Sequence, residues 1–389
     1  GIKMKIAMVG HKVVPSRRGG IENVLTSLCP LLVERGAEVT CYNRSSDKHE
    51  NEHAAMVSGG RYKGVKLKNA PTVKGRGLSA LLASYSASVM AAFSDADIVH
   101  FHAEGPCAAM WIPKLFGKKC VATVHGLDWQ REKWGNGFAA RYIKYGEKAL
   151  AKHADEIIVL SQNAHDYFKA TYNRGSVIIP NGIERPQRRE ADKITELFGL
   201  EKDGYICIIS RLTAEKGIHY LIDAYNSIST DKKLVIAGDT SDTDEYVEFI
   251  KSKAASNHDI IFTGFISGDL LDEMYSNAYL VCLPSDIEGM SLSLLEALAY
   301  KNALLCSDIP ENTAVAENHA VYFKKGDTKD LTEKLQRLCD NPQFVNEFKK
   351  DAADFILKKY NWNDVADATL AIYKEVFENK RKDCVAYEH

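Results

Sequence analysis

The sequence contains no long apolar run: none approaches the roughly 20 residues that a helix needs to span a bilayer. Near its start it also lacks a basic stretch followed by an extended apolar one, so we expect no signal peptide. The nine cysteines include no Cys-x-x-Cys pair, and the nearest two, Cys29 and Cys41, are twelve residues apart. We therefore expect buried, reduced thiols in a cytoplasmic protein, not a disulfide framework or a zinc site.

A surplus of one charge is also missing, because 50 Lys and Arg residues face 52 Asp and Glu residues. This balance hides an asymmetry. Residues 1–183 hold 25 basic and 15 acidic residues, a surplus of 10 positive charges, and the remainder has a surplus of 12 negative charges. Such halves indicate two units with different partners. The basic half has no compact Lys/Arg motif with interleaved aromatic residues, so we expect no nucleic-acid partner.

Short apolar runs alternate with helical patterns in both halves, which predicts an α/β fold with βαβ units and parallel sheets. We predict two Rossmann-like, doubly wound domains, residues 1–183 and 191–360, joined by the polar linker Glu184–Glu190. The chain ends in three predicted helices, and the last, over 362–379, completes the first domain. The predicted strands are 5–10, 38–42, 98–102, 120–124, 156–160, 177–179, 205–210, 233–237, 260–263, 279–283, 303–306 and 321–323.

Ligands of such domains bind beyond the carboxyl ends of the strands, so the loops after strands are the candidate sites. In the first domain, Gly19 and Gly20 precede a predicted helix over Ile21–Arg35 and could let the backbone approach an anion, although a plain turn explains them equally well. The spacing is not Gly-x-Gly-x-x-Gly, which disfavours a nicotinamide dinucleotide. His125 directly follows a predicted strand and could bind sugar hydroxyls or a diphosphate; the alternative is a structural loop histidine.

Two loops of the second domain carry charge beside predicted helix N-termini. Arg211 and Lys216 lie five residues apart, and two cations at such a place suit a diphosphate. Glu288 precedes the predicted helix Ser291–Tyr300, and Glu296, roughly two turns into it, could accept both ribose hydroxyls. Helix capping is the alternative for Glu288. A phosphate could be bound by the backbone N–H groups at the start of this helix, at Gly289, Met290, Ser291 and Leu292.

Over nearly its whole length the sequence resembles the GT-B glycosyltransferases of family four, whose two domains face each other across a cleft. The wording of three segments, GHKxxPSRxGGIE, HGLDWQRxKW and EGMSLSLLEAL, is similar to a bacterial subgroup that builds surface polysaccharides and includes rhamnosyltransferases. Two departures are Ser210, where the family usually has Gly, and Lys301-Asn302-Ala303, where it usually has Gly-x-Pro. The resemblance rests on Gly19-Gly20-Ile21-Glu22, His125-Gly126, Pro180-Asn181-Gly182-Ile183, Arg211 with Lys216, and the Glu288/Glu296 pair.

The resemblance implies that Arg211 and Lys216 bind the donor diphosphate, Glu296 the ribose and Glu288 the donor sugar. It also implies retention of the anomeric configuration. The first domain shows no obvious pair of close carboxylates like that of retaining glycosidases, so we expect attack on the same face, with the leaving diphosphate helping to take the acceptor proton. No metal or other cofactor is needed if two cations neutralise the diphosphate. We expect UDP or TDP, rather than GDP, as the nucleotide.

The acceptor implied by the resemblance is a polyprenyl-diphosphate-linked saccharide at the inner face of the bacterial membrane. Glu104 and Asp128 are candidate acceptor contacts, and a structural turn is the alternative for Glu104. The predicted helix Phe138–His153 offers one basic stripe, which indicates either a membrane-surface contact or a solvated face. The stripe consists of Arg141, Lys144, Lys148 and Lys152, and Lys114, Lys118 and Lys119 could add to its field.

Two metal-like patterns have simpler explanations. The run Asp242-Thr243-Asp244 precedes a predicted helix, where Asp is a common cap. His100 and His102 alternate on one strand and share a face, and we expect core or cleft-lining histidines there because no third ligand accompanies them. Two other functions stay open: a nucleotide-sugar 2-epimerase of the same architecture, and a non-catalytic protein that binds sugar nucleotides.

Overall fold

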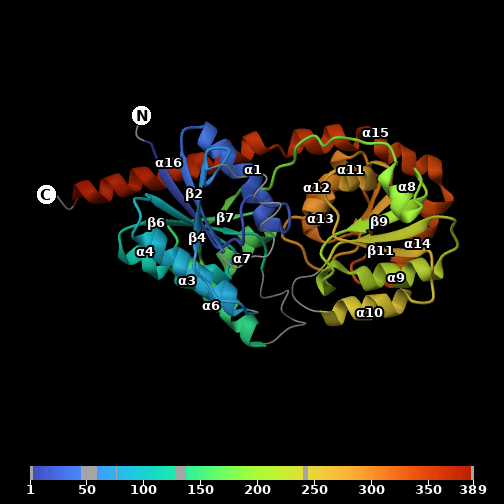
Figure 1. Cartoon of the computed structure of the whole chain (residues 1–389), viewed down its shortest axis with the longest axis horizontal. Coiled ribbons are helices and arrows are strands. Elements are labelled where there is room, and N and C mark those ends of the chain that lie inside the picture. The colour runs from blue at the N-terminus through green and yellow to red at the C-terminus, as the bar shows by residue number, and fades with distance from the viewer. Residues whose placement is uncertain (1–2, 45–58, 76, 128–136, 240–243, 387–389) are drawn as a thin grey trace. The chain divides into compact units, whose positions relative to one another are not determined.

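The computed structural model describes residues 3–44, 59–75, 77–127, 137–239 and 244–386. Two compact units make up the chain (Figure 1): Gly1–Gly182 together with Trp362–His389, and Ile183–Asn361. The predicted linker Glu184–Glu190 has no regular secondary structure. Its end is anchored on the second unit, because Arg188 Nη1 donates a hydrogen bond to the carbonyl oxygen of Tyr300 at 2.8 Å.

The described part of the first unit holds one sheet in the order β3-β4-β2-β1-β5-β6-β7-β8. Its strand pairs are parallel apart from the antiparallel pair β3 and β4. The six strands predicted for this half are confirmed, with end points that shift by at most two residues. The strands are β1 (Lys5–Val9), β2 (Glu38–Arg44), β3 (Arg61–Tyr62), β4 (Val65–Ala70), β5 (Ile98–His102), β6 (Lys119–Val124), β7 (Glu156–Val159) and β8 (Val177–Ile178).

Strands β3 and β4 were not predicted, because they lack an apolar run. In β4, Val65 and Ala70 are buried, whereas Lys68 and Asn69 between them are exposed. A polar, short edge strand of this kind protects a sheet from pairing with another chain. The strand β2 also continues to Arg44, beyond the predicted end at Tyr42, because it pairs with β4 as far as Ala70.

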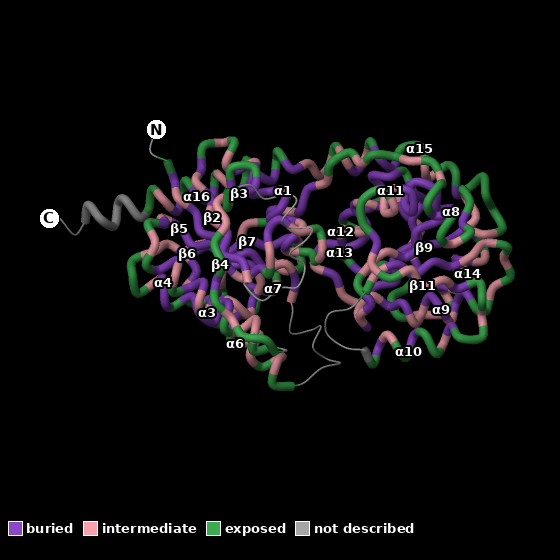
Figure 2. The backbone as a smooth tube through the Cα atoms, in the orientation of Figure 1, coloured by how far each residue is buried: buried purple, intermediate pink, exposed green. Residues whose placement is uncertain are grey.

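Helices cover the first sheet, and the last helix of the chain is one of them. Helix α16 packs against α1, where Arg35 Nε lies 2.7 Å from a carboxylate oxygen of Asp367. Tyr373 of α16 is fully buried, and Figure 2 shows in purple the buried stretches of backbone in this unit. The helices are α1 (Gly20–Glu34), α3 (Leu78–Ala92), α4 (Trp111–Leu115), α6 (Gly137–His153), α7 (Gln162–Tyr172) and α16 (Trp362–Ala386).

The second unit holds a parallel sheet in the order β11-β10-β9-β12-β13-β14. The direction of strand order reverses at β9, which pairs with β10 on one side and β12 on the other. This is the topological switch point, where doubly wound sheets bind ligands. The strands are β9 (Tyr205–Ile209), β10 (Lys233–Ala237), β11 (Ile260–Gly264), β12 (Leu280–Leu283), β13 (Leu304–Ser307) and β14 (Val321–Phe323).

Helices of the second unit mostly match the prediction. Of the three helices predicted at the end of the chain, α14 and α15 belong to this unit, and the last, predicted over 362–379, is longer in the structure as α16 of the first unit. No helix in the described residues is both long and apolar enough to cross a membrane. The helices are α8 (Lys193–Phe198), α9 (Ile218–Ser227), α10 (Asp244–Ala254), α11 (Gly268–Ser276), α12 (Leu292–Ala299), α13 (Pro310–Ala316), α14 (Thr328–Asp340) and α15 (Pro342–Lys359).

Candidate active site

Lys216 and Glu288 meet at the switch point of the second sheet. Lys216 ends a short 3-10 helix between β9 and α9, and Glu288 lies in the loop between β12 and α12. The Lys216 Nζ atom is 2.8 Å from Glu288 Oε1, and their side chains are 16% and 5% exposed. Ser285 also donates its hydroxyl to Glu288 Oε1 at 2.7 Å. The structure therefore joins two predicted site residues that are 72 positions apart in the sequence.

Gly217 allows the two loops to come this close. Its φ is +70°, and a Cβ atom there would lie 2.0 Å from the carbonyl oxygen of Pro284. Any other residue would push the loop after β9 away from the loop after β12. The contact is reinforced by the backbone N–H of Asp286, which donates to the carbonyl of Glu215 at 2.8 Å.

Arg211 stands at the outer side of this pair. Its guanidinium lies 3.9 Å from the carboxylate of Glu215, and its side chain is 44% exposed, whereas that of Glu215 is only 10% exposed. At that distance and exposure the attraction is weak. The Arg211 side chain is therefore only loosely engaged by the protein and is open to solvent, where an anionic ligand could reach it.

The N-terminus of helix α12 closes the same edge of the sheet. Ser291 caps the helix, and its hydroxyl accepts a hydrogen bond from the backbone N–H of Leu294 at 3.1 Å. Ser293 ties the helix to β9 by donating to the carbonyl of Ile209 at 2.6 Å. The predicted phosphate-binding segment Gly289–Leu292 thus leads directly into a fixed helix N-terminus, whose partial positive charge favours an anion.

Glu296 lies closer to that terminus than predicted. Helix α12 begins at Leu292, so Glu296 is just past its first turn instead of two turns in. The side chain is half-buried beside Tyr275. Burial, together with the negative charge of Glu296, raises the pKa of Tyr275 well above its usual value. The sequence analysis missed Tyr275 and Ser285. Ser285 could have been noticed, because it precedes Glu288 by three residues in the same loop.

In the first unit, the loop after β1 is fixed by buried polar contacts. Glu22 is buried and accepts a hydrogen bond from the backbone N–H of Lys12 at 3.1 Å, and burial raises the pKa of its carboxyl group. His11 Nε2 lies 2.9 Å from Asn43 Oδ1. Gly19, with a φ of +104°, caps helix α1, and Gly20 begins it. The geometry fits both interpretations of the glycine pair, an anion loop and a helix entry.

His125 follows β6 directly, and its Nε2 atom lies 3.1 Å from Nδ1 of His102. The two acceptor candidates have different outcomes. Glu104 is fully buried at the end of β5, so an acceptor could not contact it in this conformation, which favours the structural turn. Gly146 of α6 packs closely against it, since a Cβ there would lie 2.1 Å from the carbonyl oxygen of Glu104. Asp128 lies outside the described residues.

The metal-like patterns have no metal geometry in the described chain. No group of three or more His, Cys, Asp or Glu residues is placed to hold a metal ion within the ranges that the structure describes. Asp242 and Thr243 lie outside those ranges, and Asp244 begins helix α10. His100 and His102 are both buried, as predicted for core histidines.

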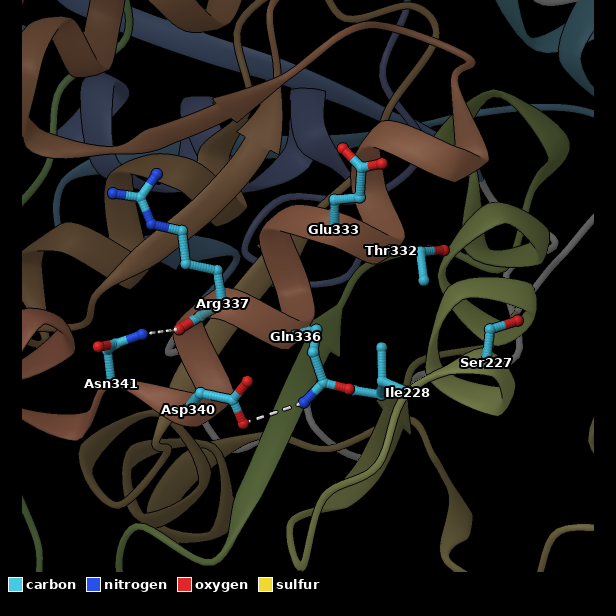
Figure 3. Close-up of a pocket in the computed structure, with 8 residues that line it drawn as sticks. All are labelled: Ser227, Ile228, Thr332, Glu333, Gln336, Arg337, Asp340 and Asn341. Atoms are coloured by element: carbon cyan, nitrogen blue, oxygen red, sulfur yellow. Dashed lines mark hydrogen bonds between the residues drawn. The ribbon is translucent and has the colours of Figure 1, made fainter.

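A surface pocket of about 530 Å³ lies at the other end of helix α9. Figure 3 shows that its lining side chains come from the end of α9 and from α14. Lys216 precedes the first residue of α9, whereas Ser227, which lines this pocket, is its last. The ten residues of the helix span about 15 Å, so the pocket and the switch point are separate places.

Two family models match the chain. Residues 18–185 match Glycosyltransferase Family 4, and residues 190–386 match Glycosyl transferases group 1. The boundary between the two models falls within the polar segment that connects the two structural units.

Individual proteins of known name show the same likeness. An uncharacterized glycosyltransferase of Methanocaldococcus jannaschii is 32% identical over 96% of this chain and 99% of its own length. Sucrose-phosphate synthase from Thermosynechococcus elongatus has a similar structure, with a TM-score of 0.80 at 20% identity over 97% of this chain and all of that one. HepE of Anabaena in complex with UDP-glucose gives a TM-score of 0.77 at 15% identity over 96% and 100%. These structures indicate a GT-B fold.

Proposed function

The chain belongs to the glycosyl transferases of group 1, and on that premise we propose that it moves a sugar from a nucleoside-diphosphate donor to a saccharide acceptor with retention of the anomeric configuration. The acceptor is lipid-linked, and the product enters a bacterial capsule, O-antigen or exopolysaccharide. The transferred sugar is a hexose or a rhamnose.

The observation that carries the proposal is the cluster at the switch point of the second sheet. Glu288 holds Lys216 in place at 2.8 Å in the loop that leads into the N-terminus of α12, and Arg211 follows β9 in the loop that carries Lys216. A diphosphate needs cations and backbone N–H groups together, and in the proposal these two cations and the helix N-terminus bind it. Glu296, just past the first turn of the same helix, binds the ribose in this proposal.

In the proposed mechanism the second unit stabilises the leaving group. Negative charge grows on the diphosphate as the bond to the sugar breaks, and Lys216, Arg211 and the α12 N-terminus stabilise that charge. The acceptor hydroxyl attacks from the face that the diphosphate leaves, and a diphosphate oxygen takes its proton. Two protein cations carry the charge that a divalent metal would otherwise balance, so we propose that EDTA leaves turnover unchanged. A strict need for Mg²⁺ or Mn²⁺ would contradict this part.

The donor is tested by a thermal-shift panel with UDP, TDP and GDP, since a ligand that binds only the folded state raises its stability. We propose that UDP or TDP stabilises the protein more than GDP, and the UDP-glucose bound to the structurally similar HepE supports this choice. Incubation with donor alone separates the alternatives. An epimerase converts the donor sugar without acceptor, a transferase requires the acceptor, and a non-catalytic protein does neither.

For the acceptor, we propose that the first unit contacts an anionic membrane surface from the cytoplasmic side. Helices α3, α4 and α6 are neighbours (Figure 1), and they expose large apolar side chains. We name five of these side chains, which are between 41% and 75% exposed, the apolar patch: Val89, Phe93, Trp111, Leu115 and Phe116. Exposed aromatic residues with a basic rim suit the interface of a bilayer.

The basic stripe predicted on α6 provides only part of a basic rim for the apolar patch. Arg141, Lys148 and Lys152 are exposed, whereas Lys144 is half-buried. The three lysines at the end of α4 and just after it contribute less than expected, because protein groups already engage them. Lys114 lies 2.8 Å and Lys119 3.9 Å from the carboxylate of Asp155, and Lys118 donates to the carbonyl of Ser94 at 2.6 Å.

A further inference from the structure

Four histidines lie around the carboxyl ends of β1, β5 and β6 in the first unit: His11, His100, His102 and His125. Strands β5 and β6 are parallel neighbours with His102 opposite Thr123. His102 ends β5 and His125 follows β6, so their rings meet at the same edge, with centroids 5.4 Å apart. His100 stacks on His102 with a centroid distance of 4.2 Å.

The contacts of His102 determine which of its nitrogens carries the proton. Burial lowers its pKa well below the usual value, so the ring is neutral and has one donor and one acceptor nitrogen. Nε2 lies 3.3 Å from the sulfur of Met8, and a thioether can only accept. The hydrogen is therefore on Nε2. The other nitrogen, Nδ1, is the acceptor, and it faces Nε2 of His125 at 3.1 Å.

We propose that Met8 and His102 act as a relay that fixes the tautomer of His125. His102 Nδ1 accepts the hydrogen bond, so Nε2 of His125 must donate it. In its neutral form, His125 then has its only acceptor on Nδ1. His102 is a positioning residue in this scheme, because it acts on a ligand through His125.

His100 holds the ring of His102 in a fixed orientation. Its Nδ1 lies 2.5 Å from the hydroxyl of Tyr373 and its Nε2 2.6 Å from the hydroxyl of Thr123. Both of its ring nitrogens thus have partners on two different elements, helix α16 and strand β6. Because His102 stacks on this fixed ring, its own ring plane is held as well. A 180° flip of the ring would put carbon atoms in the places of Nδ1 and Nε2, and would break the contacts with His125 and Met8.

The tautomer of His125 determines which kind of group its Nδ1 atom can bind. Any group that contacts Nδ1 of neutral His125 must donate a hydrogen bond. A sugar hydroxyl can do so, whereas a fully ionised phosphate oxygen cannot. This last step rests on the proposed function and resolves the two roles predicted for His125, sugar hydroxyl or diphosphate, in favour of the hydroxyl.

Long-range ¹H–¹⁵N spectra of the full chain with labelled histidine, recorded at pH 8 without ligand, test the relay directly, since they distinguish a protonated ring nitrogen from a bare one. The His102→Leu and His125→Asn variants assign the signals. We expect both His102 and His125 to carry hydrogen on Nε2. A signal for hydrogen on Nδ1 of either ring would overturn the proposal, and this result does not depend on whether the chain transfers sugar.

Met8→Leu removes the sulfur and keeps the side-chain volume. The hydrogen of His102 is then no longer favoured on Nε2, and a mixture of tautomers should appear. Met110→Leu is the matched control, because Met110 is also fully buried in the first unit and belongs to its apolar core. We expect the parent spectrum from the control. If Met8→Leu also leaves both tautomers unchanged, the sulfur does not set the direction and the relay is wrong.

Kinetics separate positioning from a structural role. His102→Leu removes the acceptor, and the loss of one neutral hydrogen bond corresponds to about a three- to tenfold decrease in kcat. His102→Asn restores a side-chain acceptor near the position of Nδ1 and should recover most of that decrease at unchanged thermal stability. Equal turnover in the two variants would overturn the positioning role. Absence of transfer by the parent protein would instead refute the proposed function and leave the spectra decisive for the relay.

Discussion

The two sheets end in polar residues of different kinds. In the second unit, the loops after β9 and β12 bring together charged side chains, with Lys216 2.8 Å from Glu288. In the first unit, the corresponding edge holds histidines that burial keeps neutral, since it lowers the pKa of His11 to about 4 and that of His100 to about 3. One architecture can therefore present fixed charge, which suits a diphosphate, or neutral donors and acceptors, which suit hydroxyl groups.

The largest effect should come from removing the charge of the second unit. We expect Lys216→Ala and Arg211→Ala each to decrease kcat by about 10²–10³, because these cations act most strongly on the charge that develops in the transition state. Steady-state kinetics at saturating donor measure the decrease. Near-parent turnover in both variants would place the diphosphate elsewhere and would remove the contrast between the units.

Stability provides the control for Lys216, because its loss leaves the buried Glu288 carboxylate without the lysine. The Lys216→Ala/Glu288→Gln double variant removes both charges and should recover the stability lost in Lys216→Ala, as followed by urea unfolding. Its turnover should stay low. Recovery of turnover as well would mean that the lysine serves only to neutralise the glutamate.

Next in size is the effect of charge on the surface of the first unit. Each lysine near an anionic bilayer contributes about 1 kcal/mol, so changing Lys144, Lys148 and Lys152 to Glu should weaken vesicle binding by about 100-fold or more. Sedimentation with anionic and neutral vesicles, at low and high salt, measures this. We expect salt-sensitive binding to the anionic vesicles only.

A control triple variant lies in the second unit, where Lys324, Lys325 and Lys329 are exposed. Changing these three to Glu should leave vesicle binding as in the parent. Equal losses in both triples would show that net charge alone matters, and no loss in the α6 variant would show that its stripe is merely solvated.

Donor affinity should respond to Glu296 by a smaller factor. In the proposed function its carboxylate binds the ribose, and charge-assisted hydrogen bonds contribute about 1.5–3 kcal/mol, so Glu296→Ala should weaken donor binding by about 10- to 100-fold with the fold intact. Glu333→Ala is the control, since Glu333 is an exposed glutamate of the same unit, beside the pocket on α14. Calorimetry with the nucleotide decides the outcome, and equal affinity in both variants would reject the ribose contact.

The neutral histidines of the first unit should make its stability depend on pH. His11 and His100 have folded-state pKa values lowered from 6.5, so the unfolded chain binds more protons below pH 6.5 and the first unit loses stability there. The slope is about 1.4 kcal/mol per pH unit for each histidine and ends near pH 4 for His11. Burial raises the pKa of Glu22, which opposes the loss. Calorimetric scans between pH 7 and 5 should show a transition whose midpoint falls, and His11→Asn should flatten that slope.

The sequence was sufficient for elements whose apolar runs are buried on both faces. The strands Ile98–His102 and Lys233–Ala237 have the predicted ends. It was insufficient for β4, which lies next to the edge strand β3 and whose Lys68 and Asn69 are exposed. Hydrophobic patterning detects burial, so a polar strand with exposed side chains leaves little to detect.

For the candidate site, too, local sequence patterns predicted some features and not others. The residue types and local positions of Lys216 and Glu288 were readable, because each stands between a strand and a helix. Their contact was not, because it depends on β9 lying beside β12 while β10 and β11 extend to the other side. The partner of His100 is further away still: Tyr373 is 273 positions along the chain, and no local pattern could pair them.

The position of α16 has a consequence for the order in which the protein can be made. Residues 1–182 leave the ribosome first, yet their unit is completed only by a helix that begins at Trp362 and buries Tyr373 in it. The second unit is continuous from Ile183 to Asn361. During synthesis, the unit translated second is thus the first whose entire sequence is available, and the surface of α1 that receives α16 stays uncovered until α16 has been translated.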